Sequence, residues 1–165
     1  MLAGSDLALL PASVVRGVDG LTALDLELLC AGMPDIDVED WCAHTRWCVR
    51  MGSGDGGELR GLLESEYVDL RAALFARLRA MSVEERARVL AFACGSGRLP
   101  AGGFQAMHPP FTVEVMPLQP TNFLPQAHTC FNMLCLPEYE SAEVLAERLD
   151  AAVEQSGGGK GFGIV

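Results

Sequence analysis

The chain has 165 residues, with 22 acidic and 12 basic side chains and a net charge of -10, and half of its residues are hydrophobic. This length fits one domain, or one compact unit with a small appendage, and the apolar content excludes an intrinsically disordered chain. The negative charge argues against nucleic-acid binding, and the sequence shows neither the roughly 18-residue apolar run of a membrane span nor a secretory signal.

Helices are predicted in the first half of the chain. Thr22 can cap a helix that ends before residues 32–34, where Gly and Pro stop it. A second helix is expected over residues 58–80, because leucines recur there at helical spacing. The segment Ser82-Val-Glu-Glu85 matches a capping box, which predicts a third helix that ends at Gly95.

Short strands and a closing helix are predicted in the second half. The pair Pro109-Pro110 ends any helix, and residues 111–115 alternate between apolar and polar side chains as a strand does. Another extended segment is expected over residues 125–137, followed by a helix that Ser141 caps. The predicted order is helices first, then strands, and then a helix that packs back on the strands. This order indicates the α+β fold class.

The cysteines show no framework spacing, so we expect reduced thiols and no disulfides. Cys42, His44 and Cys48 offer three zinc ligands, but they lack a Cys-x-x-Cys knuckle and a clear fourth ligand. A pair of half-buried thiols is therefore the favoured interpretation, and no metal site is predicted. The six cysteines are Cys30, Cys42, Cys48, Cys94, Cys130 and Cys135.

The basic residues are almost all arginines, and the single lysine is Lys160. Arginines concentrate in residues 67–98, a stretch with a positive balance inside an acidic chain. Solvated faces of two helices are the favoured interpretation, and an acid-binding patch is the alternative. The arginines concerned are Arg71, Arg77, Arg79, Arg86, Arg88 and Arg98.

A candidate nucleophile lies in the segment between Pro125 and Pro137. If this segment is extended, then His128, Cys130 and Asn132 share one face. A thiol becomes a nucleophile when a nearby base, cation or dipole favours its thiolate. Residue types alone leave a structural Cys–His pair as the more frequent case.

The stretch from Leu124 to Tyr139 resembles the active-site signature of the HECT family of ubiquitin-protein ligases. That signature reads Leu-Pro-x-x-His-Thr-Cys-Phe-Asn-x-Leu-x-Leu-Pro-x-Tyr, and every fixed position is matched. The Gly-Phe-Gly ending also resembles the family's tail, whose phenylalanine, fourth from the end, is Phe162 here. Further segments resemble the family in the same order, namely residues 28–41, 84–92 and 95–104.

The resemblance covers only the last part of the HECT domain. It implies that residues 1–32 are the end of the N-terminal lobe and the start of a hinge, and that residues 33–165 are the catalytic C-terminal lobe. Two departures stand out. Residues 48–67 look longer than their counterpart, and Leu74-Phe75 replaces an aromatic pair.

The resemblance implies a two-step acyl transfer without a cofactor or metal. The Cys130 thiolate would accept ubiquitin from a conjugating enzyme as a thioester, and an amine of a protein substrate would then take it. His128 and Thr129 would support the loop or donate hydrogen bonds to the oxyanion, and a general-base role for His128 is the less favoured alternative. Phe162 would serve the transfer to lysine.

Two other function classes stay open at this point. One is a non-catalytic module that binds ubiquitin, and the other is a cysteine protease built on Cys130, His128 and Asn132. The ligase interpretation predicts ubiquitin, a conjugating enzyme and a protein substrate as partners, with neither nucleic acid nor membrane among them. The expected location is the cytoplasm, with the nucleus left open.

Overall fold

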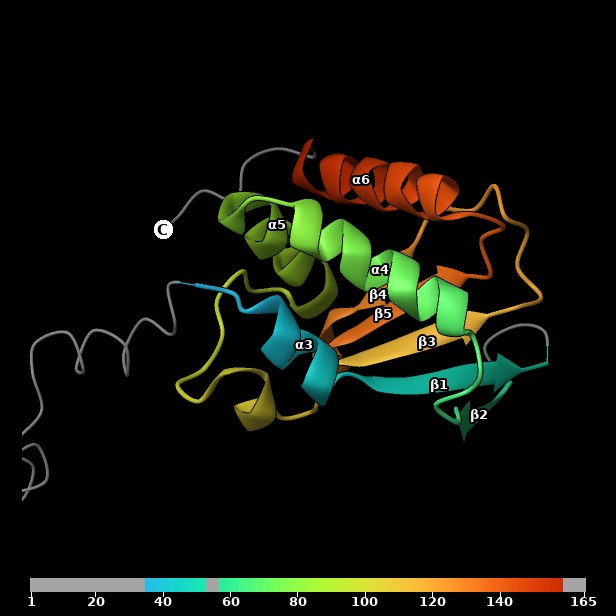
Figure 1. The fold of residues 1–165 in the computed structure, drawn as a ribbon, viewed down its shortest axis with the longest axis horizontal. Helices are drawn as coiled ribbons and strands as arrows, with labels where there is room; N and C mark the ends of the chain where they lie inside the picture. Colours follow the sequence, from blue (N-terminus) through green and yellow to red (C-terminus); the bar gives the residue numbers. More distant parts are fainter. Residues whose placement is uncertain (1–34, 53–56, 159–165) are drawn as a thin grey trace, which may run out of the picture.

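The computed structural model describes residues 35–52 and 57–158 of the chain. These residues form a mixed five-stranded sheet with the strand order β2-β1-β3-β5-β4 (Figure 1). The three central strands are parallel to one another, and each edge strand is antiparallel to its neighbour. The strands are β1 (Arg46–Met51), β2 (Glu58–Gly61), β3 (Thr112–Met116), β4 (Gln126–His128) and β5 (Met133–Pro137).

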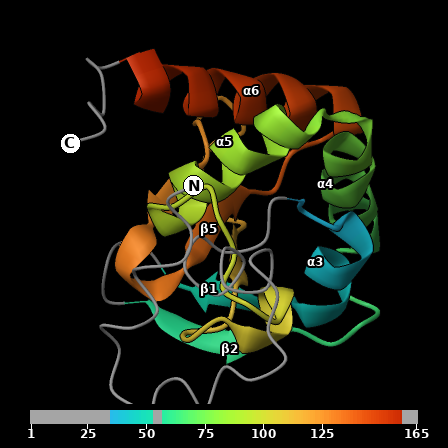
Figure 2. The same cartoon turned by 90° about the vertical axis from the view of Figure 1, so that its left-hand side faces the viewer.

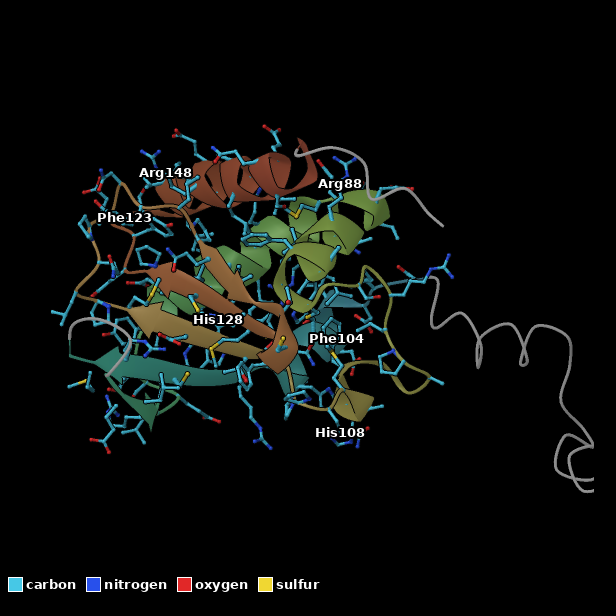
Figure 3. The ribbon with its side chains drawn as sticks, turned by 180° about the vertical axis from the view of Figure 1, so that it is seen from behind. Arg88, Phe104, His108, Phe123, His128 and Arg148 are labelled. Atoms are coloured by element: carbon cyan, nitrogen blue, oxygen red, sulfur yellow. The ribbon has the colours of Figure 1, made fainter. Side chains whose placement is uncertain are left out.

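The helices lie on one side of the sheet and along its β4 edge, and α6 packs on α4 and α5 (Figure 2). In the part of the chain that the structure describes, the opposite face of the sheet carries no helix (Figure 3). No described helix is both long and apolar enough to cross a bilayer. The helices are α3 (Val38–His44), α4 (Val68–Ala80), α5 (Val83–Cys94) and α6 (Ala142–Gly158), with the short 3-10 turns η2 (Gly103–Ala106) and η3 (Thr129–Phe131).

Alternate side chains of the central strands face the helices and form the core. Val113 and Val115 of β3 are fully buried, and Trp47, the β1 neighbour of Val113, packs its ring against Phe75 of α4. The same core extends to α3, where Trp41 stacks on the Phe104 ring at 4.8 Å. The α+β fold class is thus confirmed.

Local sequence signals predicted several elements correctly. The Ser82–Glu85 capping box is present at the start of α5, and Gly95 ends the helix in a left-handed conformation. The Ser141 hydroxyl accepts a hydrogen bond from the first turn of α6. The strand expected at residues 111–115 is β3.

The helix expected over residues 58–80 is wrong in its first half. Residues 58–61 form β2, which pairs with β1, and the helix begins only at Val68, after Tyr67 adopts a left-handed conformation. Leu59 and Leu63, which suggested a helical stripe, are 46% and 67% exposed. Pairing with β1, which depends on residues distant in sequence, overrides the local spacing.

The remaining predicted elements differ in outcome. The continuous extended segment expected over residues 125–137 is wrong, because η3 separates β4 from β5. The helix capped by Thr22 and the hinge at residues 32–34 lie outside the described residues.

The arginines of residues 67–98 mainly bind groups of this same chain, which favours the helix-face interpretation over an acid-binding patch. Arg77 pairs with Asp150 at 2.7 Å and ties α4 to α6, and Arg79 pairs with Glu39 at 2.7 Å and ties α4 to α3. Arg86 donates to the Leu78 carbonyl.

Candidate active site

Cys130 lies in the middle of η3, the turn that joins β4 to β5 at the edge of the sheet. Its side chain is exposed, and so are those of Thr129 before it and Phe131 after it. A large apolar ring that stays 62% exposed, as Phe131 does, sits on a surface that can meet a partner. The thiol is therefore open to a macromolecular reactant.

Asn132 anchors this turn from its C-terminal side. The residue has φ 50° and ψ 47°, a left-handed conformation that asparagine tolerates better than most residues. Its Nδ2 donates to the Pro109 carbonyl at 2.6 Å, and its own carbonyl accepts from the Thr112 amide at 2.9 Å. The signal for this role in the sequence is the residue type itself, since Asn is favoured in turns.

The expected alignment of His128, Cys130 and Asn132 on one strand face is wrong. His128 is the last residue of β4 and pairs with Met133, whereas Cys130 sits on the 3-10 turn and Asn132 points toward Pro109 (Figure 3 labels His128). Within the described residues, no hydrogen bond joins His128 to Cys130. A triad needs its base hydrogen-bonded to the nucleophile, so this arrangement lends no support to the protease alternative.

Helix α5 supports the turn from behind. Gly95, which ends α5, has φ 76°, and a Cβ atom built on it would lie 3.6 Å from the Thr129 Cβ. From this contact a groove of about 550 Å³ runs between α5 and α6, and we call it the α5–α6 groove. It is lined by Arg88, Ala91, Phe92, Gly95, Thr129, Val153, Ser156 and Gly157.

Three of the other described thiols, those of Cys48, Cys94 and Cys135, lie in environments that suppress the thiolate. Burial, and then the charge of Glu114, raise the pKa of the Cys135 thiol to about 12, and the same two causes raise the pKa of Cys48 to about 11. Burial raises the pKa of Cys94 to about 12. Among the five cysteines in the described ranges, Cys130 is the exposed one. The thiolate is the nucleophilic form, so exposure and chemistry single out Cys130.

The expected half-buried thiols Cys42 and Cys48 are found as such. His44, the third candidate zinc ligand, pairs with Asp40: the Nδ1 of His44 lies 2.8 Å from the Oδ1 of Asp40. Within residues 35–52 and 57–158, no three side chains of His, Cys, Asp or Glu are grouped to hold a metal ion.

Residues 16–165 match the family described as HECT-domain (ubiquitin-transferase). The chain belongs to the HECT domain family. Two similar proteins are the Apoptosis-resistant E3 ubiquitin protein ligase 1 of Mus musculus, 39% identical over 141 residues, and the E3 ubiquitin-protein ligase RSP5 of Emericella nidulans, 36% identical over 162 residues. These alignments cover 86% and 94% of this chain but only 15% and 17% of the relatives, so the chain spans less than a fifth of their length.

The HECT signature spreads over both strands that flank the turn with Cys130. Its two prolines, Pro125 and Pro137, are buried at opposite ends of the segment. Its last residue, Tyr139, is buried as well, and its hydroxyl donates to the Phe123 carbonyl at 2.8 Å. These three fixed positions are therefore buried parts of the frame around the turn with Cys130. Phe162 lies outside the described residues.

Proposed function

We propose that this chain is the catalytic part of a HECT-type ubiquitin-protein transferase that carries ubiquitin as a thioester on Cys130. The supporting observation is the position of Cys130, an exposed thiol on the turn of a fully matched HECT signature. The ubiquitin-binding module without catalysis is the alternative. It would need no thiol on the exposed turn.

The first step is a transfer between two thiols. The Cys130 thiolate attacks the carbonyl of the thioester on the conjugating enzyme, a new C–S bond forms, and the enzyme's sulfur leaves with the electron pair of the old bond. Because one thioester replaces another, the exchange is nearly neutral in free energy and needs no nucleotide. Thr129 and His128, which flank the turn's start, would support the loop or donate hydrogen bonds to the developing oxyanion.

The second step passes ubiquitin to a lysine of a protein substrate. The neutral amine attacks the thioester carbonyl and forms an amide, the C–S bond breaks with its electron pair on the Cys130 sulfur, and the proton lost by the amine passes to solvent. We propose that Phe162 serves this step by docking beside the Cys130 thioester with ubiquitin, since burial of a phenylalanine ring stabilises by about 1.5–3 kcal/mol.

The proposed division of the chain follows the resemblance. Residues 1–32 would be the end of the N-terminal lobe with the start of the hinge, and residues 33–165 the catalytic C-terminal lobe. The cytoplasm is the proposed location, with the nucleus left open.

The function is tested with a charged conjugating enzyme and non-reducing gels. Wild type, Cys135→Ala and Cys94→Ala should each form a ubiquitin adduct that thiols remove, whereas Cys130→Ala should form none. Cys130→Ser should trap an oxyester that resists thiols. An adduct that persists in Cys130→Ala contradicts the assignment, affinity for ubiquitin without any adduct indicates a binding module, and cleavage of a ubiquitin-derived amide indicates a protease.

The role of Phe162 is tested by a pulse-chase with a lysine substrate. Phe162→Ala should form the Cys130 adduct as wild type does but discharge it to lysine several-fold more slowly. Equal discharge rates in the two proteins would contradict the role.

A further inference from the structure

Strand β2 has one side of its backbone without a partner strand in the part of the chain that the structure describes. It is the terminal strand of the sheet, and all four of its residues are exposed. Figure 1 shows it beyond β1, away from the described helices. An exposed edge strand presents amide and carbonyl groups to which another strand can bind.

The pairing with β1 determines which backbone groups of β2 point outward. The Leu62 amide donates to the Trp47 carbonyl at 3.0 Å, and the register of the two strands places these residues opposite each other. Hydrogen-bonded pairs alternate along an antiparallel ladder, so every second residue of β2 bonds to β1, and Arg60 is one of them. The amide and carbonyl groups of Leu59 and Gly61 therefore point toward the open edge.

The order of charges in β2 is complementary to an antiparallel copy of itself. Charges on an edge strand usually oppose pairing between chains. In β2, however, Glu58 and Arg60 flank Leu59. When Leu59 lies opposite Leu59 of a second copy, Glu58 of each copy lies opposite Arg60 of the other. The two Leu59 side chains, each 46% exposed in the single chain, then lie side by side on one face.

Other symmetric registers of two β2 strands are less favourable. A shift by one residue places the outward groups of one strand opposite the inward groups of the other. A register centred on Glu58 or on Arg60 places like charges directly opposite each other, which destabilises a strand pair. Registers centred farther out shorten the pairing. The register centred on Leu59 satisfies both the hydrogen-bond pattern and the charges.

The two charged side chains are suited to this contact. The Arg60 guanidinium is held by Glu66, with Nη2 at 2.7 Å from Oε1 and Nη1 at 3.1 Å from Oε2. An arginine has five N–H donors, so Arg60 can bind a second carboxylate as well. The Glu58 side chain has no hydrogen bond or ion pair with any described residue. Its carboxylate is thus available to a second copy.

We propose that two copies of this chain associate through antiparallel β2 strands centred on Leu59. Each Leu59 amide donates to the Leu59 carbonyl of the other copy, and two Glu58–Arg60 ion pairs flank this centre. The association joins two five-stranded sheets edge to edge. Because β4 is the opposite edge, the two Cys130 turns lie at the far ends, about 40 Å apart across nine strand spacings. Both turns stay exposed in the dimer.

The test measures self-association of the 165-residue protein by sedimentation equilibrium, with a reductant that keeps exposed thiols from cross-linking. One short strand pair is a small interface, so wild type should be a monomer when dilute and a dimer when concentrated. Glu58→Arg should raise the dissociation constant about tenfold, because two attractive pairs become repulsive. Glu64→Arg makes the same change of charge at an exposed residue outside β2 and should leave association unchanged.

A mixture of two variants tests the register. Arg60→Glu alone should also associate weakly, but its mixture with Glu58→Arg should form a mixed dimer as stable as that of wild type, since each arginine again faces a glutamate. Thermal unfolding by circular dichroism checks that each variant is folded. If Arg60→Glu does not fold because Glu66 loses its partner, Glu58→Arg against Glu64→Arg decides.

Three results would each overturn the proposal. The first is a wild type that stays monomeric at every concentration, as expected of an edge that instead binds a strand of another protein. The second is equal association of wild type and Glu58→Arg. The third is a mixture of folded Glu58→Arg and Arg60→Glu that forms no mixed dimer.

Discussion

Cys130 and Cys135 stand five residues apart in one signature but lie in opposite environments. Cys130 is exposed on the turn between β4 and β5, whereas Cys135 is 1% exposed on β5, with its Sγ 3.8 Å from a Glu114 carboxylate oxygen. A carboxylate and burial both disfavour a thiolate. Burial and the neighbouring carboxylate therefore decide which of the two thiols can react.

The surroundings of Cys135 contain a buried ion pair. Glu114 of β3 is 0% exposed and accepts two hydrogen bonds from the guanidinium of Arg50 on β1, one of them from Nη2 at 3.0 Å. Cys48, Glu114 and Cys135 are direct neighbours across three strands. The side chains of these three residues face away from the helices. The ion pair of Arg50 and Glu114 therefore lies on the face of the sheet that the apolar core does not cover.

The largest expected effect is the difference in alkylation rate between the two thiols. At pH 7, a pKa of about 12 leaves roughly one Cys135 thiol in 100,000 as thiolate, and burial restricts access further. In folded wild type, iodoacetamide should therefore modify Cys130 at least about 1,000-fold faster than Cys135, as followed by peptide mapping. Similar rates under native conditions, with equal rates in urea as the reference, would contradict the comparison.

Removal of the Arg50 side chain tests what keeps Cys135 and Glu114 buried. Arg50→Met leaves an unpaired carboxylate in the sheet, which should lower the free energy of unfolding by about 3 kcal/mol in a urea titration. The double variant Arg50→Met, Glu114→Gln removes the charge as well and should recover most of that loss. A single variant as stable as wild type would show that the pair is dispensable.

Substitution of Asn132 has a smaller expected effect, on the Cys130 side of the comparison. Asn132→Ala loses the hydrogen bond to the Pro109 carbonyl and places alanine in a left-handed conformation, together about 2 kcal/mol. Asn132→Gly loses only the hydrogen bond, about 1 kcal/mol. Thermal unfolding of the two variants checks this order, and equal losses would show that the backbone at Asn132 is not strained by a side chain.

The elements that the sequence predicts correctly are those with local causes. The α5 start depends on Ser82 and Glu85, three residues apart, which bond each other's backbone. In contrast, β2 forms because residues 58–61 pair with β1, and the sequence of these four residues does not predict that pairing. The leucine spacing that predicted a helix there comes partly from Leu59 and Leu63, whose side chains are exposed.

The candidate site divides in the same way. The signature predicts Cys130 as the nucleophile through resemblance, and the structure shows that its side chain is exposed on the turn. The turn itself depends on the contact between Asn132 and Pro109, 23 residues apart, which no strand pattern contains. The buried pair of Arg50 and Glu114 also needs two distant strands, so a glutamate that alternates with valines gave no sign of it. The roles of His128 and Thr129 stay predictions.

The central claim, that Cys130 alone carries ubiquitin, is tested most directly by locating the adduct in unaltered protein. Wild type is charged from a conjugating enzyme, quenched in acid, digested with pepsin without reductant, and mapped by mass spectrometry. We expect the C-terminal peptide of ubiquitin on Cys130 and none on the other five cysteines, Cys30, Cys42, Cys48, Cys94 and Cys135. Ubiquitin attached to any of those five thiols, with Cys130 unmodified, would contradict the claim.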